Sequence, residues 1–162
     1  MRLRITLLDF CQWIQFSPPL AAMRSSPWLF PVIATVHLMG LAMIGGAVLV
    51  VDLRLLGLGL RRQPVAQLAR DAERWLLRSL LVSLPTGILL FMCFATKYYY
   101  LRFFWVKMTS LLLVLVFTFS VRRKVAMADD TRTRPVWNKL VALVSLSLWT
   151  TVAIGGRWIG FP

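Results

Sequence analysis

The chain has 162 residues, of which 59% are hydrophobic, and its 19 Lys and Arg outnumber its 6 Asp and Glu to leave a formal net charge of +13. A water-soluble domain of this size would not be both so apolar and so basic. Nucleic-acid binding is also disfavoured, because the basic residues flank apolar blocks and do not gather on one soluble face. This arrangement favours the lipid bilayer as the partner, with anionic lipid headgroups as the counter-charge.

The first sixteen residues carry an amphipathic pattern. A helix over about 3–16 has one apolar stripe, made of Leu3, Leu7, Phe10, Cys11 and Ile14. Polar residues interrupt the stretch and no small-residue cleavage site follows it, so a cleaved signal peptide is disfavoured. We therefore predict an amphipathic helix that lies in the outer membrane–water interface and is ended by the Ser-Pro-Pro segment at 17–19.

Four apolar blocks follow, and each is long enough to cross a bilayer as a helix. They cover about 27–51, 79–96, 103–121 and 140–156. At about 1.5 Å per residue they reach roughly 25 to 37 Å, against a hydrocarbon core of about 30 Å. Pro64 is placed to open a helix that runs into the second block, with Asp71 and Arg74 spaced to pair. The sequence predicts an all-α fold: a single transmembrane domain over 1–162, formed by an integral membrane four-helix bundle and the N-terminal interfacial helix.

The basic residues predict an orientation. The connections between the first and second blocks and between the third and fourth hold twelve Lys and Arg, whereas the other side holds six. By the positive-inside rule, both connections face the cytoplasm and both termini lie on the periplasmic side of a bacterial inner membrane. Arg122 counts here as a connection residue, and Asp52 counts as a charge at the end of the first block.

His37 is the only histidine and lies about 13 Å inside the first block, counted from Trp28. Titratable groups are costly in hydrocarbon and often functional. On its helix face, the small residues Ala34 and Gly40 let another backbone or a flat ligand approach. The imidazole can ligate haem b or a metal ion, hydrogen-bond a quinone or relay a proton. It can equally be a neutral ring bonded to a hydroxyl or carbonyl of a neighbouring helix.

Lys107 is the second titratable residue inside an apolar block, and its helix face continues to Ser110. It is shallow enough to snorkel to the interface. Because no carboxylate is expected at mid-membrane, a carboxylate-based ion pump is disfavoured, and an inward-facing Lys107 needs a hydroxyl, a carbonyl, another subunit or an anionic ligand. The candidate cofactor-binding residues are His37, Gly40, Lys107 and Ser110, and His37 is also the candidate metal ligand.

The second block carries a polar seam on one side of a helix that contains Pro85. Its members are Ser79, Ser83, Thr86, Cys93 and Lys97. Such hydroxyls serve helix packing or line a solute path. No catalytic motif predicts an enzyme: the two cysteines form no CxxC, and no HExxH, Walker or GxGxxG pattern occurs. With one histidine, bis-histidine haem ligation would require a homodimer.

Several segments of the chain resemble a family of short bacterial membrane proteins of unknown function. They are "SPPLAAMRSSPWLFPVIATVHLMGLAMIGGAVLVVDLRLLGLGLRR", "TGILLF", "FFWVKM" and "GGRWIGF", of which "HLMGLAMIGGAVLVVDLRLLG" is the most specific. The resemblance covers most of the chain and implies a four-helix inner-membrane protein without an assigned activity. The chain also has a looser resemblance to copper-resistance-D type membrane domains and to membrane-type protoporphyrinogen oxidases, in that it carries a histidine in the first span and a lysine in the third.

These observations lead to three functional hypotheses for a multi-pass inner-membrane protein that forms a homo-oligomer or joins a membrane complex. The first is a redox-associated component that binds haem or quinone near His37 and Lys107. The second is a small-solute or metal-ion permease that uses the polar seam. The third is a structural subunit without a ligand of its own.

Overall fold

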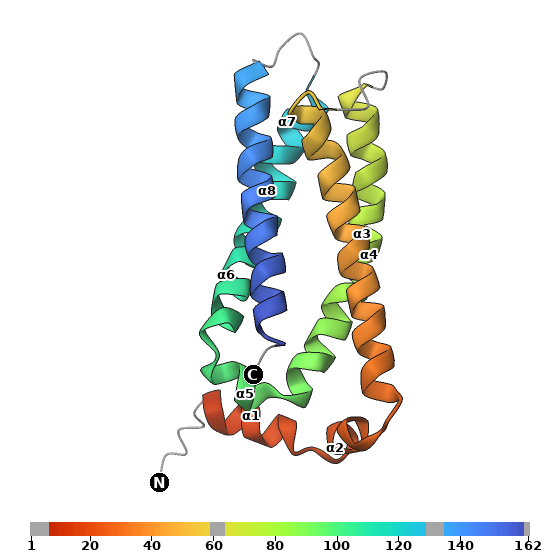
Figure 1. Cartoon of the computed structure of the whole chain (residues 1–162), viewed down its shortest axis with the longest axis vertical. Helices are drawn as coiled ribbons and strands as arrows, with labels where there is room; N and C mark the ends of the chain where they lie inside the picture. Colours follow the sequence, from red (N-terminus) through yellow and green to blue (C-terminus); the bar gives the residue numbers. More distant parts are fainter. Residues whose placement is uncertain (1–6, 59–63, 129–134, 161–162) are drawn as a thin grey trace.

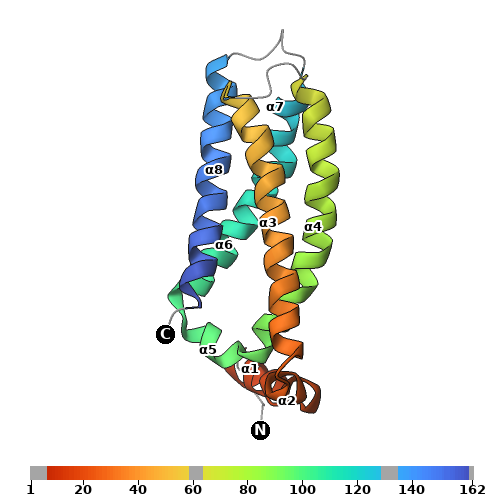
Figure 2. The same cartoon turned by 45° about the vertical axis from the view of Figure 1, so that its right-hand side comes forward.

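The computed structural model describes residues 7–58, 64–128 and 135–160, and every regular element in these ranges is helical. Four long helical stretches lie side by side along the long axis (Figures 1 and 2). They are α3 (Leu29–Leu55), α4 (Val65–Cys93), α8 (Pro135–Trp158) and the continuous run of α6 (Arg102–Phe117), η1 (Thr118–Arg122) and α7 (Arg123–Met127). Each is long and apolar enough to cross a membrane, so the predicted all-α membrane bundle is confirmed.

The four stretches form two antiparallel pairs. Helix α3 packs along α4, and α6 packs along α8, while α3 also touches α8. The C-terminus of α3, α7 and the first turns of α4 and α8 lie together at one end, here called the loop end (Figure 1). The short helices α1 (Leu7–Gln15), α2 (Pro18–Ser25) and α5 (Ala95–Tyr100) lie at the opposite end, here called the α5 end.

Helix α4 follows the predicted start but ends earlier than the apolar block. Its N-cap is Pro64, and Arg74 Nη1 lies 3.7 Å from Asp71 Oδ1, as their spacing predicted. The helix ends at Cys93, and Phe94 turns the chain into α5. Pro85 lies inside α4, where its ring removes one backbone donor.

The predicted amphipathic helix is present as α1, and part of its apolar stripe faces outward. Cys11 is buried, whereas a row of large apolar residues is exposed: Leu7, Phe10, Trp13 and Phe16. Of the expected stripe, Leu7 and Phe10 are exposed, whereas Cys11 and Ile14 turn inward because one flank of α1 packs against α5 and α4. Leu3 lies outside the described residues. The N-terminal helix ends at Gln15, just before the Ser-Pro-Pro segment, as predicted, and Pro18 then begins a separate short helix, α2.

A transverse apolar layer crosses the bundle near its middle. It is formed by the buried Ile44 and Val48 of α3 and Leu76 and Leu80 of α4, with Leu115 of α6 and Trp149 of α8 packed against them. All four long helical stretches therefore contribute to it. Polar side chains gather on each side of this apolar layer.

Candidate functional site

His37 lies where α3 contacts α4, on the α5-end side of the apolar layer. Its Nδ1 is 3.0 Å from the carbonyl oxygen of Ser83 and 3.0 Å from Thr86 Oγ1. The Thr86 hydroxyl donates to the Val82 carbonyl oxygen at 2.7 Å, so its oxygen can accept from His37. A proton on Nδ1 satisfies both contacts, and the neutral ring then carries its lone pair on Nε2. Within the described ranges, Nε2 has no hydrogen-bond partner.

A glycine of α4 makes room for the imidazole. A Cβ at Gly87 would lie 2.9 Å from Cε1 of His37, closer than a methyl group tolerates. The Nδ1–Cε1 edge of the ring therefore lies against the α4 backbone. Ser83, Thr86 and Gly87 together determine the position and the tautomer of the half-buried His37.

Gly40 serves the contact between α3 and α4. A Cβ there would lie 2.2 Å from Ser83 Oγ and 3.5 Å from the Ser79 carbonyl oxygen. The sequence allowed either another backbone or a flat ligand beside Gly40. In the structure, the neighbouring helix α4 fills this space. Ser83 thus touches α3 twice, through its side chain at Gly40 and through its carbonyl at His37.

Lys107 lies half-buried on α6, against a pair of glycines on α8. A Cβ at Gly155 would be 3.2 Å from Lys107 Cβ, and one at Gly156 would be 3.4 Å from Nζ. The side chain therefore runs along the surface of α8. No ion pair to Lys107 occurs among the residues that the structure describes. Ser110, almost fully buried, lies one turn deeper on α6.

The structure brings His37 and Lys107 into the same half of the bundle, from opposite helix pairs. Ser83 and Thr86 were recognised from the sequence as part of a polar seam, but their contact with His37 was not. Gly87, Gly155 and Gly156 were also missed as site residues, because a glycine gives no sign in the sequence of what it lies against.

A second polar cluster, which we did not expect, lies on the loop-end side of the apolar layer. Asp52 is fully buried, and its Oδ1 accepts a 2.6 Å hydrogen bond from Arg122 Nε while Oδ2 accepts one of 2.6 Å from Ser145 Oγ. Arg122 also donates from Nη2 to the Val48 carbonyl oxygen at 3.1 Å. The cluster thus links α3, η1 and α8.

Two sequence expectations are corrected here. Arg122 is not a connection residue, and Asp52 is not outside the bundle interior, because the helices continue beyond the apolar blocks. One signal in the sequence points to this arrangement: Asp52 follows Ile44 and Val48 at helical spacing, on the face that they bury.

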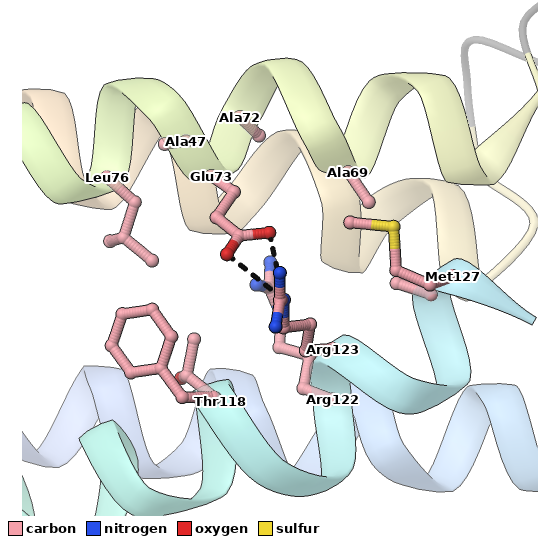
Figure 3. A pocket seen from close by; sticks show the side chains of 11 residues that line it. Ala47, Ala69, Ala72, Glu73, Leu76, Thr118, Arg122, Arg123 and Met127 are labelled. Atoms are coloured by element: carbon pink, nitrogen blue, oxygen red, sulfur yellow. Dashed lines mark hydrogen bonds and ion pairs between the residues drawn. The ribbon is translucent and has the colours of Figure 1, made fainter.

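The π-helical turn η1 borders a small pocket between α4 and α7 (Figure 3). Figure 3 shows Glu73 of α4 facing Arg122 and Arg123, and Glu73 Oε1 lies 3.0 Å from Arg123 Nε. The pocket has a free volume of about 20 Å³, enough for about one water molecule. Thr118 lines it, and in the described part of the chain the buried Thr118 Oγ1 has no hydrogen-bond partner.

Comparison with known proteins identifies a family but no activity. The model of a family of unknown function, DUF6644, matches residues 30–162. No curated protein and no solved structure matches the chain. The matched region contains both polar clusters and leaves out α1 and α2.

Proposed function

The chain belongs to the DUF6644 family of unknown function, and we propose that it is a multi-pass inner-membrane protein that binds a redox cofactor, haem b or a quinone, beside His37. The observation that carries this proposal is the state of the imidazole. Ser83 and Thr86 hold Nδ1, while Nε2 keeps a lone pair without a partner among the described residues.

This geometry suits a ligand at Nε2. Histidines that bind a metal commonly donate the other ring N–H to a carbonyl, which orients the ring and raises its basicity. The contact between Nδ1 and the Ser83 carbonyl is of this kind. The same lone pair can accept a hydrogen bond from the hydroxyl of a quinol.

Lys107 supplies the positive charge of the proposed site. It carries no ion pair within the described residues, and a half-buried ammonium is stabilised by a partner. A haem propionate or a quinone carbonyl would accept hydrogen bonds from Nζ. Ser110 lies deeper on the same helix and adds a hydroxyl at the floor of the site.

The orientation and the assembly state belong to the same proposal. Exposed basic residues of α4 and α7, Arg70, Arg74 and Lys124 among them, support a cytoplasmic loop end by the positive-inside rule. His37 and Lys107 would then lie in the periplasmic half.

The assembly state depends on the ligand. Bis-histidine haem ligation would need a homodimer that supplies one His37 from each copy, whereas a site with a single axial histidine would need only one copy. The permease alternative has less support, because the Ser83 side chain of the polar seam packs against Gly40 of α3.

The test is to purify the protein from its native membrane, record its absorbance spectrum and analyse an organic-solvent extract for quinones. We expect either a haem Soret band or an extractable quinone, lost in His37→Ala and retained in the neighbouring exposed variant Met39→Ala. Lys107→Met should weaken binding without abolishing it, if the ammonium only neutralises an anionic group. A wild-type preparation that is colourless, quinone-free and metal-free would overturn the proposal.

A further inference from the structure

The apolar layer separates the two polar clusters of the bundle. On α3, His37 precedes Ile44 and Val48, and Asp52 follows them. On α4, Glu73 precedes Leu76 and Leu80, and Thr86 follows them. Since Leu115 of α6 and Trp149 of α8 close the same level, each long helical stretch places an apolar side chain between the clusters.

The described residues of the layer form no continuous hydrogen-bonded chain along which a proton could pass. Aliphatic side chains neither donate nor accept hydrogen bonds. Two buried polar atoms lie at its level: Ser79 Oγ, between Leu76 and Leu80 on α4, and Trp149 Nε1 on α8. Neither has a hydrogen-bond partner in the described part of the chain, so neither belongs to a hydrogen-bonded chain across the layer. An indole N–H donates but does not accept, so it cannot pass a proton on.

The position of His37 along α3 favours proton exchange from the α5 end of the bundle. It lies about 12 Å from Leu29 at the α5 end of the helix, but about 27 Å from Leu55 at the loop end. His37, Thr86 and Lys107 all lie between the apolar layer and the α5 end, whereas the buried Ile44, Val48, Leu76 and Leu80 lie between His37 and the loop end.

We propose that protons reach the His37 site only from the α5 end, because the apolar layer seals it from the loop end. This proposal rests on the proposed function in taking His37 as the binding site, but it holds for any ligand at that site. Among the described residues, α4 turns the uncharged Ser83, Thr86 and Gly87 toward His37. Lys107 shares the α5-end side of the layer with His37. A ligand bound at Nε2 would therefore exchange protons with the α5-end side.

The single histidine makes a direct experiment possible, because [15N]histidine labelling marks one residue of the chain. The labelled full-length protein is reconstituted in vesicles of phosphatidylethanolamine and phosphatidylglycerol, with the α5 end outward in all molecules. The external pH and the luminal pH are then varied separately between 8 and 5. We expect the imidazole 15N resonances to shift with the external pH and not with the luminal pH.

A matched pair of variants tests the layer itself. Leu80→Ser polarises the layer, where the side chain is 7% exposed, and should make the resonances respond to both sides. Leu81→Ser makes the same change at a 75% exposed neighbour and should leave the sidedness as in the wild type. Wild-type resonances that follow the luminal pH, both sides or neither side would overturn the proposal. The readout needs no cofactor, so its failure is distinct from the absence of a haem or quinone.

Discussion

Asp52 and Arg122 form a buried ion pair, with 2.6 Å between Oδ1 and Nε, that joins the α3–α4 pair of helices to the α6–α8 pair. The two side chains come from helices that are not neighbours in the sequence. Ser145 binds the second carboxylate oxygen, so the carboxylate is held from η1 and from α8. The two helix pairs are thereby fastened together on the loop-end side of the apolar layer.

Breaking this ion pair from one side should be costly. Arg122→Leu leaves Asp52 buried without its counter-charge, and we expect a loss of about 3–5 kcal/mol in the free energy of unfolding. Asp52→Leu with Arg122→Leu should recover much of that loss. Unfolding in mixed micelles measures both. The control is Arg123→Leu, whose pair with Glu73 is more exposed and should contribute about 1 kcal/mol or less. Equal losses from Arg122→Leu and Arg123→Leu would contradict the buried pairing.

The contact at Gly40 should be sensitive to a single methyl group. In Gly40→Ala the new Cβ meets Ser83 Oγ at 2.2 Å, and we expect a destabilisation of about 1–3 kcal/mol. Adding Ser83→Ala removes the clash and should restore part of the loss. Gly45→Ala, which has nothing within 4 Å, serves as the control. Comparable stabilities of Gly40→Ala and Gly45→Ala would show that α3 and α4 do not pack as described.

The imidazole of His37 should move when α4 gains a methyl group beside it. Gly87→Ala places a Cβ 2.9 Å from Cε1, so the ring must shift away from Ser83 and Thr86. We expect altered 15N resonances of the single histidine and, on the proposed function, lower cofactor occupancy. The control is Gly46→Ala, where a new Cβ has nothing within 4 Å, and the His37 resonances should stay as in the wild type. Unchanged resonances in Gly87→Ala would refute the contact.

Arg24 should hold α1 and α2 against the end of α4. Its Nη1 donates to the carbonyl oxygens of Gln15 and Cys93, the latter at 2.9 Å. In Arg24→Gln we expect faster hydrogen–deuterium exchange in residues 7–25 and no change within the four long helices. Lys97→Gln removes the same charge from an exposed position at the same end and should leave that exchange rate unchanged. Equal hydrogen–deuterium exchange rates of residues 7–25 in the two variants would show that Arg24 does not hold α1 and α2 against α4.

The proposed orientation predicts where reporter fusions work. A reporter active only in the cytoplasm should be active after Leu58 and after Ala128, since both follow helices that end at the loop end. The same reporter fused after Pro162 should be inactive. A periplasmic reporter should give the complementary result. Activity of the cytoplasmic reporter at the C-terminus would invert the orientation and place His37 in the cytoplasmic half.

Hydropathy by itself determined the all-α membrane bundle. A backbone in hydrocarbon must satisfy its own hydrogen bonds, so four apolar blocks of sufficient length leave helices as the natural solution. Local chemistry also predicted the start of α4 at Pro64 and the pairing of Asp71 with Arg74, because both depend on residues within one turn. His37 and Lys107 were evident as candidates because charge is rare inside such blocks.

Tertiary structure alone decided what these residues contact. The apolar blocks mark where the chain can enter lipid, but the helices continue past them, and this extension brings Arg122 onto Asp52. The partners of His37 depend on the rotation and register of α3 against α4, which are determined by close packing at Gly40 and Gly87. Within the apolar blocks, the faces toward lipid and the faces toward other helices are both largely apolar, so hydropathy does not encode which faces pack together. The contacts that select one register therefore became visible only once the helices were in place.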